Sequence, residues 1–71
     1  SNAKLVNRAL GQIMTLTGVD AATAEKALRE SGNHVKTAVL MIKRGLSAEA
    51  AKQLLAESED NLRQALSRTG I

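Results

Sequence analysis

The chain has no cysteine, proline, phenylalanine, tyrosine or tryptophan, and it has one histidine among its 71 residues. Without cysteine it can form no disulfide framework, thiol nucleophile or cysteine-based zinc site. A single histidine excludes a histidine-rich metal site. The lack of aromatic rings removes the stacking platforms on which many proteins bind single-stranded nucleic acid. We expect neither a metal nor another cofactor.

Charge of neither sign dominates, since ten Lys and Arg residues against seven Asp and Glu residues give a net charge of +3 at pH 7. This balance is mildly basic and lacks the dense positive patch of a dedicated DNA-binding protein. The longest apolar run, residues 38–42, is far too short to span a membrane, and no secretory signal pattern is present. We expect a cytoplasmic protein that binds neither nucleic acid nor a membrane.

The first three residues, Ser1-Asn2-Ala3, are typical of the scar that remains after an expression tag is cleaved, and we exclude residues 1–3 from the fold. The sequence then starts at Lys4 without an initiator Met. We therefore expect an excised piece of a longer protein, so that part of the chemistry lies outside this chain. A piece of this length forms one small domain at most.

Apolar residues recur with helical spacing throughout the chain, and no stretch shows the alternation that a strand needs. Five helices are predicted: one that ends at residue 17 and four at residues 21–31, 34–44, 48–57 and 59–68. Glycines follow the first three helices, and Gly70 closes the chain. The helix at 34–44 is apolar on more than one side, so we expect it to be the most buried. The expected N-terminal caps of the last four helices are Asp20, Asn33, Ser47 and Ser58.

An internal repeat with a spacing of about 27 residues relates two parts of the chain. Its matches fall on caps and core positions, so two helical hairpins with the same packing needs are our preferred explanation, and a true duplication is the alternative. The matched pairs include Gly18 and Gly45, Asp20 and Ser47, Ala24 and Ala51, Leu28 and Leu55, Ser31 and Ser58, and Ala38 and Ala65.

The middle of the chain has a glycine-containing loop, an acidic cap, an Ala-Leu helix, a Ser31-Gly32-Asn33 turn and Val35-Lys36-Thr37-Ala38 at the start of the next helix. In these features residues 17–38 resemble a UBA-like three-helix module. The resemblance implies an all-α fold. We expect a small UBA-like three-helix bundle at 4–45, extended by a second helical hairpin at 46–71 that packs on it to form one compact domain.

A wider resemblance is carried by four runs: Lys4-Leu5-Val6-Asn7-Arg8-Ala9, Thr17-Gly18-Val19, Asn33-His34-Val35-Lys36-Thr37-Ala38-Val39-Leu40-Met41 and Gly45-Leu46-Ser47-Ala48-Glu49-Ala50-Ala51. Through them nearly the whole chain after Ala3 resembles the C-terminal part of N-acetylmuramic acid 6-phosphate etherases. The resemblance implies a bacterial enzyme of cell-wall sugar recycling. That enzyme cleaves the D-lactyl ether of its substrate, giving N-acetylglucosamine 6-phosphate and D-lactate without a metal.

In that family an upstream sugar-isomerase-type domain holds the phosphosugar and carries the catalytic glutamates, so we assign no catalytic residue to this chain. By analogy with the related glucokinase regulatory protein, the resemblance implies that this piece is a helical lid. The expected partners are the phosphosugar and the upstream domain, from the same chain or a neighbouring subunit of a homodimeric parent. We expect no activity from the piece alone and carbon–oxygen lyase activity from the parent.

The best candidates for contact with a substrate phosphate, or within a lid, are Asn33, His34, Lys36 and Thr37. They lie where a helix starts, and the N–H groups and positive dipole end of a helix start suit an anion. His34 and Lys36 add hydrogen-bond donors and charge. The structural alternative is that Asn33 is only a cap and that His34 and Lys36 are only solvated surface residues.

Other polar residues are interpreted as structural. The carboxylates lie on polar helix faces or in first turns, and Lys43 and Arg44 complement the dipole at the end of the helix at 34–44. The main alternative function is a UBA-like protein–protein interaction module without a catalytic role. A helix-turn-helix nucleic-acid binder is disfavoured, because Glu residues are mixed evenly with Lys and Arg on the helices.

Overall fold

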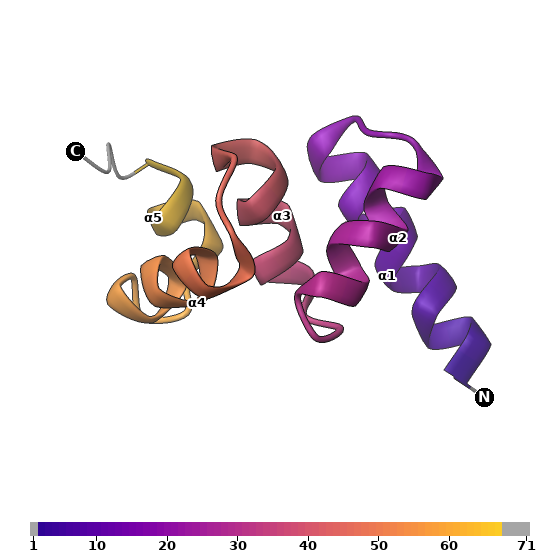
Figure 1. Ribbon diagram of the computed structural model, residues 1–71, viewed down its shortest axis with the longest axis horizontal. Helices are drawn as coiled ribbons and strands as arrows, with labels where there is room; N and C mark the ends of the chain where they lie inside the picture. The colour runs from indigo at the N-terminus through magenta and orange to yellow at the C-terminus, as the bar shows by residue number, and fades with distance from the viewer. Residues whose placement is uncertain (1, 68–71) are drawn as a thin grey trace.

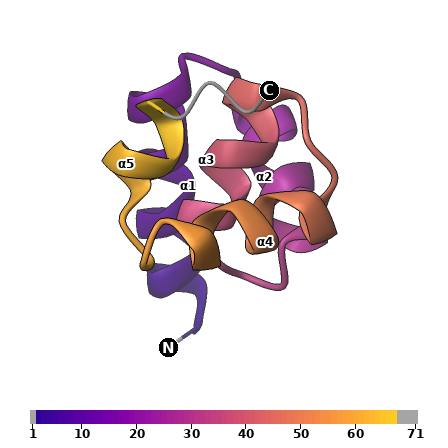
Figure 2. The same cartoon turned by 90° about the vertical axis from the view of Figure 1, so that its left-hand side faces the viewer.

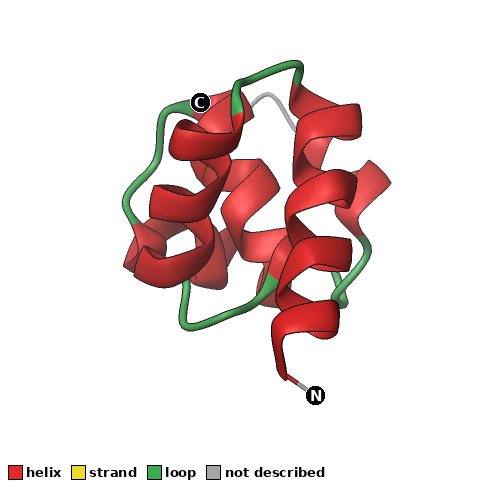
Figure 3. Cartoon of the chain, turned by 90° about the vertical axis from the view of Figure 1, so that its right-hand side faces the viewer, coloured by secondary structure: helices red, strands yellow, loops and turns green. Residues whose placement is uncertain are grey.

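The computed structural model describes residues 2–67, which form five α-helices and no strand (Figures 1 and 3). The all-α prediction with five short helices is confirmed. No helix in this range is long and apolar enough to cross a membrane. The helices are α1 (Asn2–Thr17), α2 (Ala21–Glu30), α3 (Val35–Arg44), α4 (Ala48–Glu57) and α5 (Leu62–Ser67). Helix α1 thus includes two of the three residues interpreted as a tag scar, while residues 68–71, with the predicted closing Gly70, lie outside the described range.

Two of the predicted N-caps are confirmed. Asp20 has an extended backbone, and its Oδ1 accepts a hydrogen bond from the N–H of Thr23 at 2.9 Å. Ser47 does the same for α4, since its Oγ accepts from the N–H of Ala50 at 3.1 Å. Each cap satisfies one of the backbone donors that the first turn of a helix leaves without an intrahelical partner.

The predicted cap of α3 is wrong. Asn33 has a φ of 68°, in the left-handed region, whereas an N-cap residue needs an extended backbone. His34 occupies the cap position, and its side chain makes no capping hydrogen bond. The buried hydroxyl of Ser31 satisfies the turn instead: its Oγ accepts from the N–H of His34 at 3.0 Å and donates to the carbonyl of Leu28 at 2.7 Å.

The predicted start of the last helix is also wrong. Ser58, the expected N-cap, is fully buried and forms the C-cap of α4. Glu59 and Asp60 follow it with φ angles of 57° and 62°, so the chain turns through two left-handed residues before α5 begins. The side chain of Asn61 supplies the cap, because its Oδ1 accepts from the N–H of Gln64 at 2.9 Å.

The two turns are equivalent members of the internal repeat. In the first, the N–H of Asn33 donates to the carbonyl of Leu28 at 2.9 Å. In the second, the N–H of Asp60 donates to the carbonyl of Leu55 at 2.9 Å. Since the same backbone hydrogen bond recurs about 27 residues later, the repeat is a property of the structure as well as of the sequence.

Helix α3 lies between the other helices and belongs to two three-helix units, one with α1 and α2 and one with α4 and α5 (Figures 1 and 2). The first core consists of Ile13, Ala24, Ala27, Leu28, Ala38 and Val39, and the second of Leu40, Ala51, Leu55 and Ala65. Four consecutive residues of α3, 37–40, are buried, which fits the prediction that this helix is the most enclosed.

The repeat extends further upstream than the sequence pattern alone indicates. Ile13 in α1 and Leu40 in α3 are both fully buried, occupy positions one repeat apart, and each anchors the core of its own unit. Helix α3 is therefore the last helix of the first unit and the first helix of the second.

Candidate functional site

The four candidate residues lie together at the start of α3. They line a depression of about 320 Å³, whose opposite wall comes from the end of α4 and the turn that follows it. The lining residues are Asn33, His34, Val35, Lys36, Thr37, Leu55 and Asp60. Helix α4 packs against α3 and lies across it (Figure 1), and the turn after α4 brings Asp60 to Lys36 near the start of α3.

The candidates differ in how far they reach solvent. Asn33, His34 and Lys36 are exposed, whereas Thr37 is only 3% exposed. Three side chains are therefore available to a ligand at the surface, and Thr37 belongs to the floor of the depression.

Lys36 is held by an acidic partner from the α4–α5 turn. Its Nζ donates to the main-chain oxygen of Asp60 at 2.9 Å and forms an ion pair with Oδ2 of Asp60 at 3.1 Å. The side chains are 49% and 75% exposed, so solvent screens the pair and its contribution to stability is below about 1 kcal/mol. A phosphate that approaches Lys36 would therefore displace a weak partner.

Asp60 is not foreseen from the sequence, because it lies 24 residues away from Lys36. The local sequence pattern gives no signal for this contact, because it depends on how α4 packs against α3.

The start of α3 carries neither a side-chain cap nor an acidic residue in its first turn. The positive end of the helix dipole is consequently offset by no carboxylate of its own helix. The charge of the exposed Lys36, one residue into the helix, is balanced by the carboxylate of Asp60 at 3.1 Å. The combination suits an anion that takes the place of the Asp60 carboxylate.

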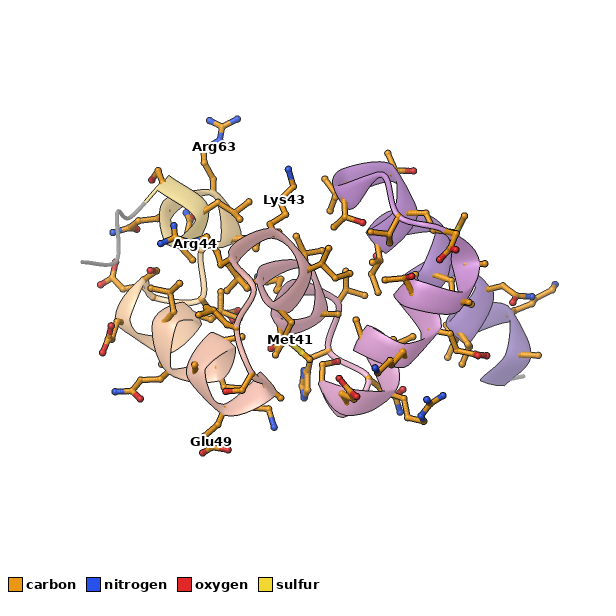
Figure 4. The ribbon with its side chains drawn as sticks, turned by 45° about the horizontal axis from the view of Figure 1, so that its top comes forward. Met41, Lys43, Arg44, Glu49 and Arg63 are labelled. Atoms are coloured by element: carbon orange, nitrogen blue, oxygen red, sulfur yellow. The ribbon has the colours of Figure 1, made fainter. Side chains whose placement is uncertain are left out.

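The basic residues at the other end of α3 do not join this site. In Figure 4, Lys43 and Arg63 point away from the body of the domain, while Arg44 lies against α5. Nη1 of Arg44 donates to the carbonyl oxygen of Leu66 at 3.2 Å. Arg44 thus ties the end of α3 to the end of α5, where a cation also complements the negative end of the dipole.

The described residues contain no group of three or more His, Cys, Asp or Glu side chains that could hold a metal ion. Hydrogen bonds from Thr23 hold the pKa of the Asp20 carboxyl group below its ordinary value. Asp20 caps α2 and does not line the depression at the start of α3.

Comparison with known proteins decides what kind of segment this is. It is 45% identical over 69 residues to N-acetylmuramic acid 6-phosphate etherase of Klebsiella aerogenes, 48% over 67 residues to etherase 1 of Bacillus licheniformis, and 46% over 68 residues to etherase 1 of Vibrio cholerae. These matches cover 94–97% of the chain. The chain is homologous to the C-terminal part of these etherases.

The chain spans only 22–23% of the length of these etherases. No protein-family model matches it, and no solved structure matches it. The predicted resemblance to the C-terminal part of the etherases is confirmed, and the matched region includes the depression at the start of α3.

Proposed function

We propose that this chain is the C-terminal helical accessory domain of a cytoplasmic N-acetylmuramic acid 6-phosphate etherase, and that it acts as a lid over the phosphosugar. The parent enzyme cleaves the D-lactyl ether and yields N-acetylglucosamine 6-phosphate and D-lactate. The observation that carries this proposal is the 45–48% identity over nearly the whole chain to proteins with that name. The catalytic groups belong to the upstream domain.

In this proposal the start of α3 faces the substrate phosphate. Lys36 exchanges its contact with Asp60 for one with the phosphate, while Asn33 and His34 supply further donors at the rim. Thr37 contributes to the floor. The exposed ion pair of Lys36 and Asp60 supports this exchange, because a screened pair is easily given up. Closure of the lid would exclude water and complete the site around the bound sugar.

The upstream part has a sugar-isomerase-type fold in this proposal and comes from the same chain or from a neighbouring subunit of a homodimer. The first unit, α1 to α3 within residues 4–45, takes the role of a UBA-like bundle, and residues 46–71 add the hairpin. The backbone repeat supports a division into two similar units, which share α3.

The test is D-lactate release from N-acetylmuramic acid 6-phosphate by the full parent chain. It is compared with a parent truncated before Lys4 and with the variants Lys36→Ala and Lys43→Ala. Lys43 is the matched control, because it is an exposed lysine of the same helix at the opposite end. We expect the truncated parent to lose activity while its circular dichroism shows a folded remainder.

We expect Lys36→Ala to raise KM for the phosphosugar by about tenfold, the value of one partly exposed charge-assisted hydrogen bond, and Lys43→Ala to leave it unchanged. Equal KM values for the two variants would rule out the contact at α3. An intact parent that releases no lactate would rule out the etherase assignment and favour the alternative, a UBA-like protein–protein interaction module.

A further inference from the structure

The large apolar side chains that are exposed in the described range all lie on α1. Leu5 is 65% exposed, Val6 39% and Leu16 48%. Leu5 and Val6 are part of a larger groove. Together with Ala9, Leu28 and Asn33 they line a groove of about 480 Å³ between the first half of α1 and the end of α2, which we name the α1 groove.

The α1 groove adjoins the candidate site, because Asn33 lines both the groove and the depression at the start of α3. The N-terminal end of α1 also projects beyond the α2–α3 turn (Figures 1 and 2). A partner seated in the groove would therefore contact Asn33, which also lines the candidate site.

Charge along α1 indicates the chemistry of the partner. This helix contains Lys4 in its first turn and Arg8 three residues after Leu5, beside the groove and not in its lining, and it contains no Asp or Glu. Cations at the N-terminal end of a helix are unfavourable, because the dipole is already positive there. A partner surface with acidic side chains around an apolar centre would offset this charge and cover Leu5 and Val6.

We propose that the α1 groove is the docking surface for the upstream part of the etherase polypeptide, through an apolar patch rimmed by acidic side chains. This inference rests on the proposed function. The matched region is 22–23% of the etherases' length and lies at their C-terminal end, so most of the polypeptide precedes α1 in those proteins.

The size of the groove favours a tethered partner over a second copy of this chain. A stable contact between separate proteins buries about 1,000 Å² or more, whereas only two large exposed apolar side chains, Leu5 and Val6, line the groove. A partner on the same polypeptide needs less area, because a short tether gives it an effective concentration in about the millimolar range.

The test is the rate at which iodoacetamide alkylates a cysteine introduced into the groove. The chain has no cysteine, so Leu5→Cys introduces a single thiol into it. In a longer polypeptide, mass spectrometry identifies the peptide that carries this thiol. Glu49→Cys is the control, since Glu49 is exposed on α4 and points away from the body of the domain (Figure 4). Both variants are made in the full parent and in the 71-residue chain.

We expect Cys at position 5 to react at least about tenfold more slowly in the parent than in the 71-residue chain, and Cys at position 49 to react equally in both. Adding Arg8→Glu to the Leu5→Cys parent should restore a fast reaction, because it places an acid against the acidic rim. Equal rates for position 5 in the two proteins would overturn the proposal. If Cys at position 5 still reacts slowly in the parent that carries Arg8→Glu, the partner surface has no acidic rim, and that part of the proposal is wrong.

The same parent preparations are assayed for D-lactate release, which separates this inference from the proposed function. Lactate release without protection at position 5 overturns the docking surface alone. Protection without lactate release overturns the etherase assignment and leaves the docking surface in place. Protection in the 71-residue chain that disappears on dilution identifies a second copy as the occupant and overturns the proposal.

Discussion

The α4–α5 turn contains a residue whose replacement by glycine should stabilise the domain. Glu59 has a left-handed backbone with a φ of 57°, and its side chain makes no hydrogen bond or ion pair within the described residues. At the equivalent place in the first turn the chain has Gly32, with a φ of 75°. Glycine adopts this conformation without the steric penalty that a β-carbon brings.

The magnitude follows from two opposing effects. A left-handed conformation costs an L-residue about 1–2 kcal/mol, and glycine gains about 0.4–1 kcal/mol of extra freedom in the unfolded chain. The balance predicts that Glu59→Gly raises the free energy of unfolding by about 0.5–1 kcal/mol. For a domain of this size the corresponding increase in Tm is about 2–8 °C.

Gly32→Ala is the mirror experiment. A β-carbon built on Gly32 would lie 3.9 Å from Cδ2 of His34, an ordinary van der Waals contact, so the substitution introduces no clash. Its effect is therefore conformational only, and we expect a loss of about 0.5–1 kcal/mol. Thermal unfolding is followed by far-ultraviolet circular dichroism, because the chain has no aromatic residue to serve as a fluorescent reporter. A lower Tm for Glu59→Gly, or an unchanged Tm for Gly32→Ala, would refute the reasoning.

Three further predictions concern the interior and the caps. Ser31→Ala should lower the free energy of unfolding by about 1–3 kcal/mol in urea titrations, because the N–H of His34 loses the buried hydroxyl that it binds. Leu40→Ala should lower it by about 2–5 kcal/mol, a large share of the roughly 4–10 kcal/mol expected for a domain of this length. Hydrogen bonds from Thr23, chiefly from its side chain and to a lesser extent from its backbone, lower the pKa of Asp20. The ionised carboxylate therefore stabilises the fold above pH 3.8, the ordinary pKa, and this stabilisation is lost as the pH falls through the folded-state pKa. Asp20→Asn keeps a capping side chain and should abolish that part of the acid dependence in thermal melts recorded from about pH 5 down to pH 2.

The helices could be predicted because local signals determine where each one ends. Gly18 and Gly45 adopt left-handed φ angles of 78° and 65° at the ends of α1 and α3, as glycine after a helix commonly does. Asp20 and Ser47 cap the helices that follow. These features depend on residues a few positions apart, so sequence spacing is sufficient to identify them.

The errors arise where the chain makes two left-handed residues in succession. Asn33 and Ser58 belong to the residue types that cap helices well, so the sequence suggests that the next helix begins directly after each of them. In the structure Ser31 and Ser58 are buried under their turns, and the next helix starts later. Glutamate rarely adopts a left-handed conformation, so the residue type of Glu59 does not predict the turn.

Of the candidate site, the start of α3 could be predicted from the sequence, and the opposite wall with Asp60 could not. The start of α3 follows from helix boundaries, and the properties of a helix N-terminus make it a candidate for anions. Asp60 reaches Lys36 through the packing of α4 against α3, and no local sequence pattern predicts that packing. The groove beside Leu5 and Val6 likewise depends on where α2 ends relative to α1.

The sharing of α3 by both units limits how a lid made of this domain could move. The first turn of α3 presents Lys36, its middle fills the first core with Val39 and the second with Leu40, and its last residue, Arg44, is tied to α5. A displacement of α3 relative to either unit would therefore break a close-packed core. If the domain acts as the proposed lid, it should therefore move as one rigid body, without a change in the packing of α3 against either unit.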